Sequence, residues 1–332
     1  MKLYKNKITY ISFILAVLVV IRHSVNIEVY GLTSGTLYWI ELVFREISDV
    51  AVPMFFTLSG FLFFQNYKPE LLKEKWKSRV FSILVPYFAW NIIAYVYYEL
   101  IYLLPLVSEN MSSAIEPFNF EWLIKNMLFG YHNITWFLQN LFLYIMIVPL
   151  LFPILQNKTA GIAFTIAVFL AGCFCRGFGN IAFNGVFYLV GACLGIHQRD
   201  AVQRRYNVKL VIFSIAFFCL IAVLNILFPL VNYVSRTPIR IVQCLLLWIA
   251  AEVVAIDSSP KWWMSISFII YCSHSMILES IEKLFKIVFG DTVLGAMLDF
   301  VFAPIITLSI IFIVSAIVKK QKMLWKILSG NR

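Results

Sequence analysis

Two of the four histidines lie in apolar stretches of the sequence, where an ionisable side chain is costly. His23 ends a run of Leu, Val and Ile, and His274 lies in a later apolar stretch. On insertion scales a charged residue at the middle of a membrane helix costs about 2.5 to 3.5 kcal/mol, so ionisable residues there are functional candidates. Histidine, with an ordinary pKa near 6.5, can act as a general base at neutral pH. For His23 the alternative is a lone interfacial histidine bonded to a carbonyl group.

Polar residues also recur at helical spacing on one apolar stretch. The spacing i, i+4, i+8 and i+11 places four of them on one helix face, which we expect to line a cavity: Tyr87, Asn91, Tyr95 and Tyr98. Pro86 precedes this face and can bend the helix. The alternative is that the stripe makes hydrogen bonds that pack helices together.

Two shorter stripes accompany the histidines. Ser267, Tyr271 and His274 follow the spacing i, i+4, i+7 and share one helix face. Ser12 lies eleven residues before His23, about three helical turns, so these two also share a face. Packing by hydrogen bonds is again the alternative, but several polar stripes in apolar helices favour a common cavity.

A basic segment, Lys68–Arg79, separates two apolar stretches. Four of its cations are candidates for binding phosphate groups: Lys73, Lys75, Lys77 and Arg79. The segment can equally be a topogenic loop near anionic headgroups.

The composition shows which elements must position these residues. Of 332 residues, 61% are hydrophobic and 13% are charged, with a mean hydropathy of +0.86, so the chain is an integral membrane protein. A membrane helix needs about 20 apolar residues. We expect an all-α bundle of about ten transmembrane helices in a single membrane domain over 1–332, with spans near 8–26, 49–66, 80–104, 134–155, 159–175, 181–196, 210–231, 239–256, 263–281 and 296–318.

The basic residues predict the orientation of these spans. With the N-terminus inside, most of the 27 Lys and Arg residues fall in inner segments, including a basic cytoplasmic tail at 319–332. Both termini are therefore expected in the cytoplasm. The net charge of +10 then reflects membrane sidedness, and no nucleic-acid partner is needed to explain it.

The six cysteines all fall in predicted spans and are expected to be small apolar fillers. Cys173-Phe174-Cys175 lacks partner ligands, so we expect no metal site.

Several segments together resemble the acyltransferase-3 family of multi-span membrane acyltransferases, over about 6–318. The most specific is Val52–Leu62 (VPMFFTLSGFL), which is similar to a Pro-x-Phe-Phe-x-x-Ser-Gly signature. The others are Leu18–Ser24 ending in the motif histidine, Arg79 followed by Val85-Pro86-Tyr87 and Trp90-Asn91, then Trp136-Phe137-Leu138 and Tyr271-Cys272-Ser273-His274.

The resemblance implies transfer of an acyl group, usually acetyl, from cytosolic acetyl-CoA to a hydroxyl of a carbohydrate or its lipid-linked precursor. His23 would be the general base, and the basic segment would hold the phosphates of acyl-CoA. Ser59, Tyr87, Asn91 and Arg22 are the candidates for an oxyanion donor. We expect the enzyme in the plasma or inner membrane, with no permanently bound cofactor.

Two positions depart from the family's pattern. Many members have Arg where this chain has Ser12, and a basic residue where it has Gln139, so donor handling is expected to differ. A transporter for a sugar or lipid intermediate is the main alternative, and it would move substrate without acyl-CoA. A non-catalytic membrane scaffold is the third, and it would not depend on either histidine.

Overall fold

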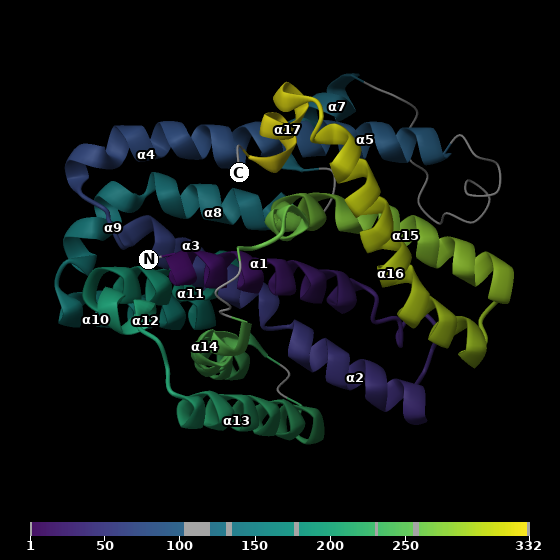
Figure 1. Cartoon of the computed structure of the whole chain (residues 1–332), viewed down its shortest axis with the longest axis horizontal. Helices are drawn as coiled ribbons and strands as arrows, with labels where there is room; N and C mark the ends of the chain where they lie inside the picture. Colours follow the sequence, from purple (N-terminus) through teal and green to yellow (C-terminus); the bar gives the residue numbers. More distant parts are fainter. Residues whose placement is uncertain are drawn as a thin grey trace. The chain divides into compact units, whose positions relative to one another are not determined.

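A computed structural model describes residues 2–102, 120–130, 135–175, 179–229, 232–254 and 259–330. These residues form helices and no strand (Figure 1). The all-α prediction is therefore confirmed for this part of the chain. The chain folds into two compact units, Met1–Lys73 with Leu143–Ser267 and Glu74–Phe142 with Phe268–Arg332.

The first unit contains the N-terminal helices and most of the central ones. Its helices are α1 (Lys2–His23), α2 (Thr36–Ser48), α3 (Ala51–Phe64), α9 (Val148–Leu155), α10 (Lys158–Phe174), α11 (Gly179–His197), α12 (Arg199–Gln203), α13 (Val208–Leu227) and α14 (Tyr233–Ala250), with short 3-10 segments at Pro69–Leu71, Ala251–Val254 and Trp262–Ile266. Asparagines at 157, 207 and 232 begin α10, α13 and α14, because each side-chain oxygen accepts a backbone N–H of the first turn.

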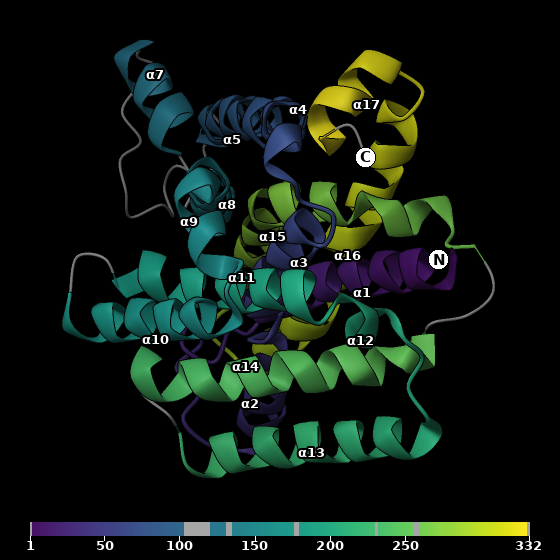
Figure 2. The ribbon, with the colours of Figure 1, turned by 90° about the vertical axis from the view of Figure 1, so that its left-hand side faces the viewer.

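Helices α3 and α11 pack with their backbones in close approach. A Cβ atom at Gly60 would overlap the carbonyl oxygen of Tyr188, and one at Gly191 would overlap that of Thr57. Small residues permit such approach in membrane proteins, where helices associate through van der Waals contact. Helix α10 lies against α11, and α13 against α14 (Figure 2). Helix α1 packs on α3, where Leu15 and Met54 belong to one apolar core.

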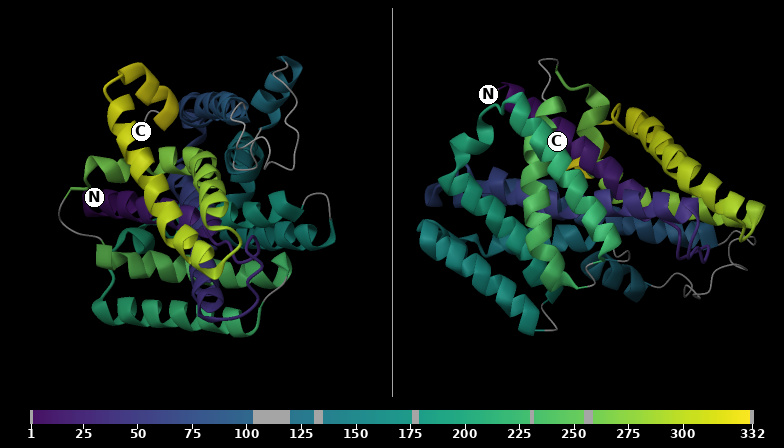
Figure 3. Two further views of the ribbon diagram at one scale, coloured as in Figure 1. Left: turned by 90° about the vertical axis from the view of Figure 1, so that its right-hand side faces the viewer. Right: turned by 90° about the horizontal axis from the view of Figure 1, so that it is seen from below.

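The second unit contains α4 (Leu72–Arg79, which begins in the last residues of the first unit), a π-helical turn (Val80–Leu84), α5 (Val85–Tyr102), α7 (Phe120–Phe129), α8 (Trp136–Met146), α15 (Ser267–Phe289), α16 (Val293–Val318) and α17 (Lys322–Ser329). Helix α5 packs against α7 and α17. The turn from α15 to α16 passes through Gly290, which has a φ of 63°, and is drawn in yellow-green in Figure 3. Thr292 then caps α16.

Each of the ten predicted apolar stretches overlaps helical residues in the described part of the chain, and 134–155 is divided between α8 and α9. Among the described residues, eight helices are long and apolar enough to cross a membrane, and α8 with α9 forms a further candidate bent by 64°. Helix α10 is apolar but shorter, with 17 residues. The count of about ten and the orientation of the termini stay predictions.

The segment between the second and third predicted spans differs from its prediction. A loop is expected at Lys68–Arg79, but Pro69–Ile101 is one continuous helical stretch. The helix continues because only Pro69, at its first turn, interrupts a run of good helix formers. Helices α2, α7, α12 and α17 also lie in segments where no span is predicted.

Candidate active site

His23 is the last residue of α1, and its side chain is exposed. Arg22, the residue before His23, is held in place because its Nε donates to Asp49 Oδ1 at 2.6 Å. Asp49 follows α2 directly, so this ion pair attaches the end of α1 to the end of α2. An exposed histidine on a positioned helix end can meet a hydroxyl that arrives from outside the helix bundle.

A buried charge network extends from this ion pair. The Arg240 guanidinium lies 2.8 Å from Glu46 Oε1 and 3.2 Å from Asp49 Oδ2, and its side chain is only 7% exposed. It also donates to Gln243 Oε1 at 2.7 Å. The network therefore connects α14 and α2 with Arg22, one residue from His23. Sequence reasoning missed it, although Thr237, Arg240 and Gln243 share the buried face of α14 at spacings of three residues.

Ser59 lies half-buried on α3, in the segment with the specific Ser-Gly motif. Packing explains why the next residue, Gly60, is a glycine, because any side chain there would overlap the α11 backbone at Tyr188. The glycine thus brings α3 onto α11, and the serine is held on that rigid pair.

In the second unit, the polar stripe of α5 is buried along its whole length. Tyr87 OH donates to Leu128 O at 2.9 Å, and Gln139 Nε2 donates to Tyr87 OH at 2.6 Å and to Phe129 O at 3.0 Å. Gln139, one of the two departures from the family's pattern, therefore holds Tyr87 and α7 in place. Further along the stripe, Tyr98 OH donates to Glu279 of α15 at 3.0 Å.

Asn91 differs from the tyrosines of its stripe. It has no exposed surface and lies beside the Tyr87 hydroxyl, but neither its Nδ2 nor its Oδ1 makes a hydrogen bond of good geometry with the described residues. A buried amide without partners is unfavourable and uncommon in folded proteins. Such a group is well suited to a bound ligand that supplies the missing bonds.

His274 is fully buried on α15. Its Nδ1 lies 2.8 Å from Tyr271 O and 3.1 Å from Ile270 O. Carbonyl oxygens only accept, so Nδ1 carries the proton and Nε2 holds the lone pair in the neutral ring. Nδ1 of His274 is therefore used in hydrogen bonds to carbonyl oxygens of its own helix.

The basic segment forms part of a pocket in the second unit. This pocket, of about 520 Å³, is lined by Glu74, Lys77, Ser78, Arg79, Phe81, Ser82 and Gly330. Of the four predicted phosphate-binding cations, Lys77 and Arg79 line it. Lys73 and Lys75 do not, and Lys73 belongs to the first unit.

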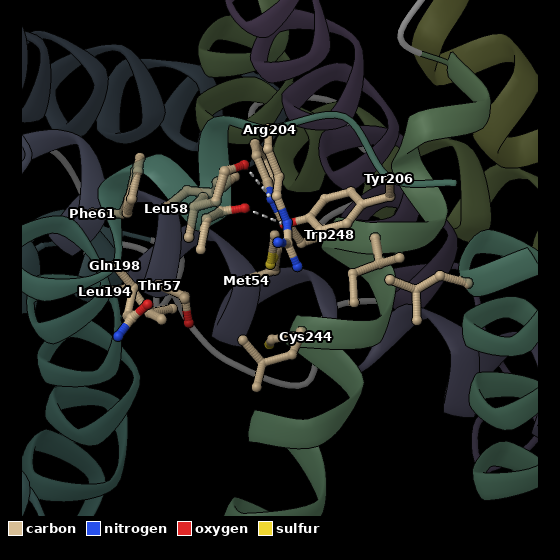
Figure 4. A pocket seen from close by; sticks show the side chains of 15 residues that line it. Met54, Thr57, Leu58, Phe61, Leu194, Gln198, Arg204, Tyr206, Cys244 and Trp248 are labelled. Atoms are coloured by element: carbon tan, nitrogen blue, oxygen red, sulfur yellow. Dashed lines mark hydrogen bonds between the residues drawn. The ribbon is translucent and has the colours of Figure 1, made fainter. Parts of the chain in front are cut away.

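The first unit has an apolar cavity of about 300 Å³ among α3, α11, α13 and α14 (Figure 4). Met54 and Phe61 of α3 and Trp248 of α14 line it, and Arg204 and Tyr206 contribute polar groups. The Trp248 indole donates to Val202 O at 3.1 Å, and the Tyr206 phenol donates to Ala201 O at 3.0 Å (Figure 4). Burial raises the pKa of Tyr206, which keeps this phenol protonated as a donor.

A buried lysine contacts Trp248, one of the residues that line this cavity. Lys7 Nζ is 3.0 Å from Glu252 Oε2 and 4.3 Å from the centre of the Trp248 ring. The ion pair and the cation–π contact together compensate the buried ammonium group. The sequence indicates only an inner basic residue at Lys7, so this structural role is not predicted.

The candidate residues are divided between the two units. His23, Ser59 and Lys73 belong to the first, and Tyr87, Asn91, His274, Lys75, Lys77 and Arg79 belong to the second. Their convergence on one cavity stays a prediction. Within the described ranges, no group of three or more His, Cys, Asp or Glu side chains is placed to hold a metal ion.

A family model described as an acyltransferase domain matches residues 6–318, nearly the whole chain. Comparison with curated proteins and with solved structures gives no significant match.

Proposed function

Because the chain belongs to the acyltransferase-3 family and is a multi-pass membrane protein, we propose that it is an O-acyltransferase of the plasma membrane. The donor is cytosolic acyl-CoA, with acetyl as the expected acyl group. The acceptor is a hydroxyl of a cell-surface carbohydrate or of its lipid-linked precursor. The observation that carries the proposal is the family match over 6–318, which includes every candidate residue of the site.

The chemistry follows from the groups available. Neutral His23 removes the proton of the acceptor hydroxyl as its oxygen attacks the thioester carbonyl. The tetrahedral oxyanion needs a hydrogen-bond donor, for which Ser59, Tyr87 and the Asn91 amide are candidates. Collapse of the intermediate forms the ester and breaks the C–S bond. The CoA thiolate then takes the proton from the His23 imidazolium, which restores the base.

Two structural features support this assignment. His23 is exposed at the end of α1, with Arg22 fixed by Asp49, so the base is both accessible and positioned. Asn91 has the unused hydrogen-bonding capacity that a substrate carbonyl or an oxyanion requires. Arg22 is a weaker oxyanion candidate than the other three, because its Nε already binds Asp49.

The test is transfer of radiolabelled acetyl from acetyl-CoA to glycan acceptors by the purified chain in lipid nanodiscs. We expect His23→Ala to lower the rate by about 100-fold or more, the usual contribution of a general base. His197→Gln is the matched control, since His197 bonds to Leu155 O at 2.8 Å in the first unit and should retain transfer. Full transfer by His23→Ala would show that the mechanism is wrong. Substrate flux into proteoliposomes without acyl-CoA would instead indicate a transporter.

A further inference from the structure

The C-terminal helix α17 lies beyond the residues that the family model matches. The match ends at residue 318, and α17 spans Lys322–Ser329. Nevertheless, Gly330, the residue that ends α17, lines the same pocket as Lys77 and Arg79. A segment outside the family domain therefore contributes to a pocket formed by a motif inside it.

Two contacts fix the end of α17 at this pocket. Trp90 Nε1 of α5 donates to Leu328 O at 3.0 Å. Gly330 has a φ of 69°, and its N–H bonds to Lys326 O, which ends the helix in the left-handed conformation. A Cβ atom at Gly330 would lie 2.6 Å from Ser82 O, so only glycine permits this closure.

The lining residues favour a phosphate group as ligand. Lys77 and Arg79 supply two cations and Ser78 and Ser82 supply hydroxyls, against one carboxylate, Glu74. Arginine and lysine are the usual partners of phosphate. Next to them, Val80–Leu84 is a π-helical turn, an irregularity frequently found at functional sites.

We propose that the end of α17 forms one wall of a phosphate-binding pocket with Lys77 and Arg79, and that this pocket holds phosphate groups of the acyl-CoA donor. The inference rests on the proposed function for the identity of the donor. Because phosphate is also the headgroup of anionic lipids, the experiment must distinguish the two sources.

The test measures the Kd of free CoA for the full-length chain by titration calorimetry in neutral phosphatidylcholine nanodiscs. Arg79→Gln should raise the Kd by about tenfold, the loss of one charge-assisted hydrogen bond. Gly330→Ala should raise the Kd by about fivefold, the size of effect expected when one hydrogen-bonding contact to the ligand is weakened. Gly290→Ala is the matched control, since Gly290 has a similar φ of 63° but no atom within 4 Å of an added Cβ, and it should leave the Kd unchanged. Trp90→Phe, which removes the bond to Leu328, is a second variant in case Gly330→Ala does not fold.

The outcomes separate this inference from the proposed function. If Arg79→Gln weakens CoA binding while Gly330→Ala and Trp90→Phe match the control, the role of α17 is refuted and the donor assignment stands. If CoA binds and no variant changes its Kd, the pocket is not its site, so the inference is refuted while the proposed function stands. If CoA does not bind, both are refuted. A parallel arm titrates phosphatidylglycerol into the nanodiscs. One result in this arm is that the lipid protects α17 from hydrogen exchange while CoA has no effect. That result would assign the pocket to a lipid headgroup. It would refute the role of the pocket in binding the donor, but α17 would still form one wall of a phosphate-binding pocket.

Discussion

Arg240 Nη1 lies 2.8 Å from Glu46 Oε1. The arginine side chain is buried among α2, α13 and α14, in the unit that also contains His23. Asn225 of α13 donates to the same carboxylate at 2.7 Å. One buried cation thus holds together helices that are far apart in the sequence. Removing one partner of a buried pair is costly because the other charge remains buried and uncompensated.

Replacing this arginine should therefore destabilise the protein. We expect Arg240→Ala to lower the free energy of unfolding by about 3 to 5 kcal/mol, because Glu46 and Asp49 would lose their buried counter-charge. The measurement is the thermal unfolding midpoint in detergent. Arg236→Ala, at an exposed position one turn earlier on α14, is the control and should change the free energy by less than about 1 kcal/mol. Equal effects of the two variants would contradict a structural role for the buried network.

The close approach of α3 and α11 leads to a second prediction. Gly191→Ala should lower the free energy of unfolding by about 3 kcal/mol or more, because the added methyl overlaps Thr57 O and the two backbones must separate. Gly185→Ala, on the same helix, places its methyl 3.6 Å from the Tyr144 ring and should be tolerated. Unfolding midpoints and the yield of monodisperse protein compare the two. If Gly191→Ala is as stable as Gly185→Ala, the helices do not need this contact.

The unpartnered amide of Asn91 allows a test that separates stability from activity. Asn91→Leu should keep or raise the unfolding midpoint, since it removes a buried polar group that has no hydrogen bonds among the described residues. The same variant should lower acyl transfer by about 100-fold if the amide binds the oxyanion. Thr307→Val is the control, because Thr307 is buried in the same unit with its hydroxyl also unpartnered within the described ranges, and it should affect stability in the same direction while preserving transfer. A fall in stability with transfer preserved would show that Asn91 serves packing.

The helices could be predicted from the sequence because apolar runs of span length are a strong, local signal. The α5 stripe could be predicted as well, since Tyr87, Asn91, Tyr95 and Tyr98 lie on one buried face.

The helicity of Lys68–Arg79 could not be predicted in the same way, because its charges suggest a loop, whereas charged residues are also good helix formers. The bend between α8 and α9 was also missed. It lies next to Pro149 and Pro153, which interrupt the backbone hydrogen bonding of an otherwise apolar run.

The candidate site was less accessible to sequence reasoning, for a physical reason. Arg240, Glu46 and Asp49 lie in segments whose proximity depends on tertiary packing, and no spacing in the sequence reports it. Lys7 likewise meets Glu252 across 245 positions of the chain. Local periodicity identifies which residues share a helix face, but partners on other helices follow only from the fold.

The close approach of Gly330 to Ser82 has a consequence for the order in which the second unit is assembled. Ser82 lies near the start of that unit and Gly330 near its end. Because both residues line one pocket, the pocket can be completed only after α17 has been synthesised. The helix that closes the pocket is thus the last part of the unit to take its place, and no ligand can meet both walls before it does.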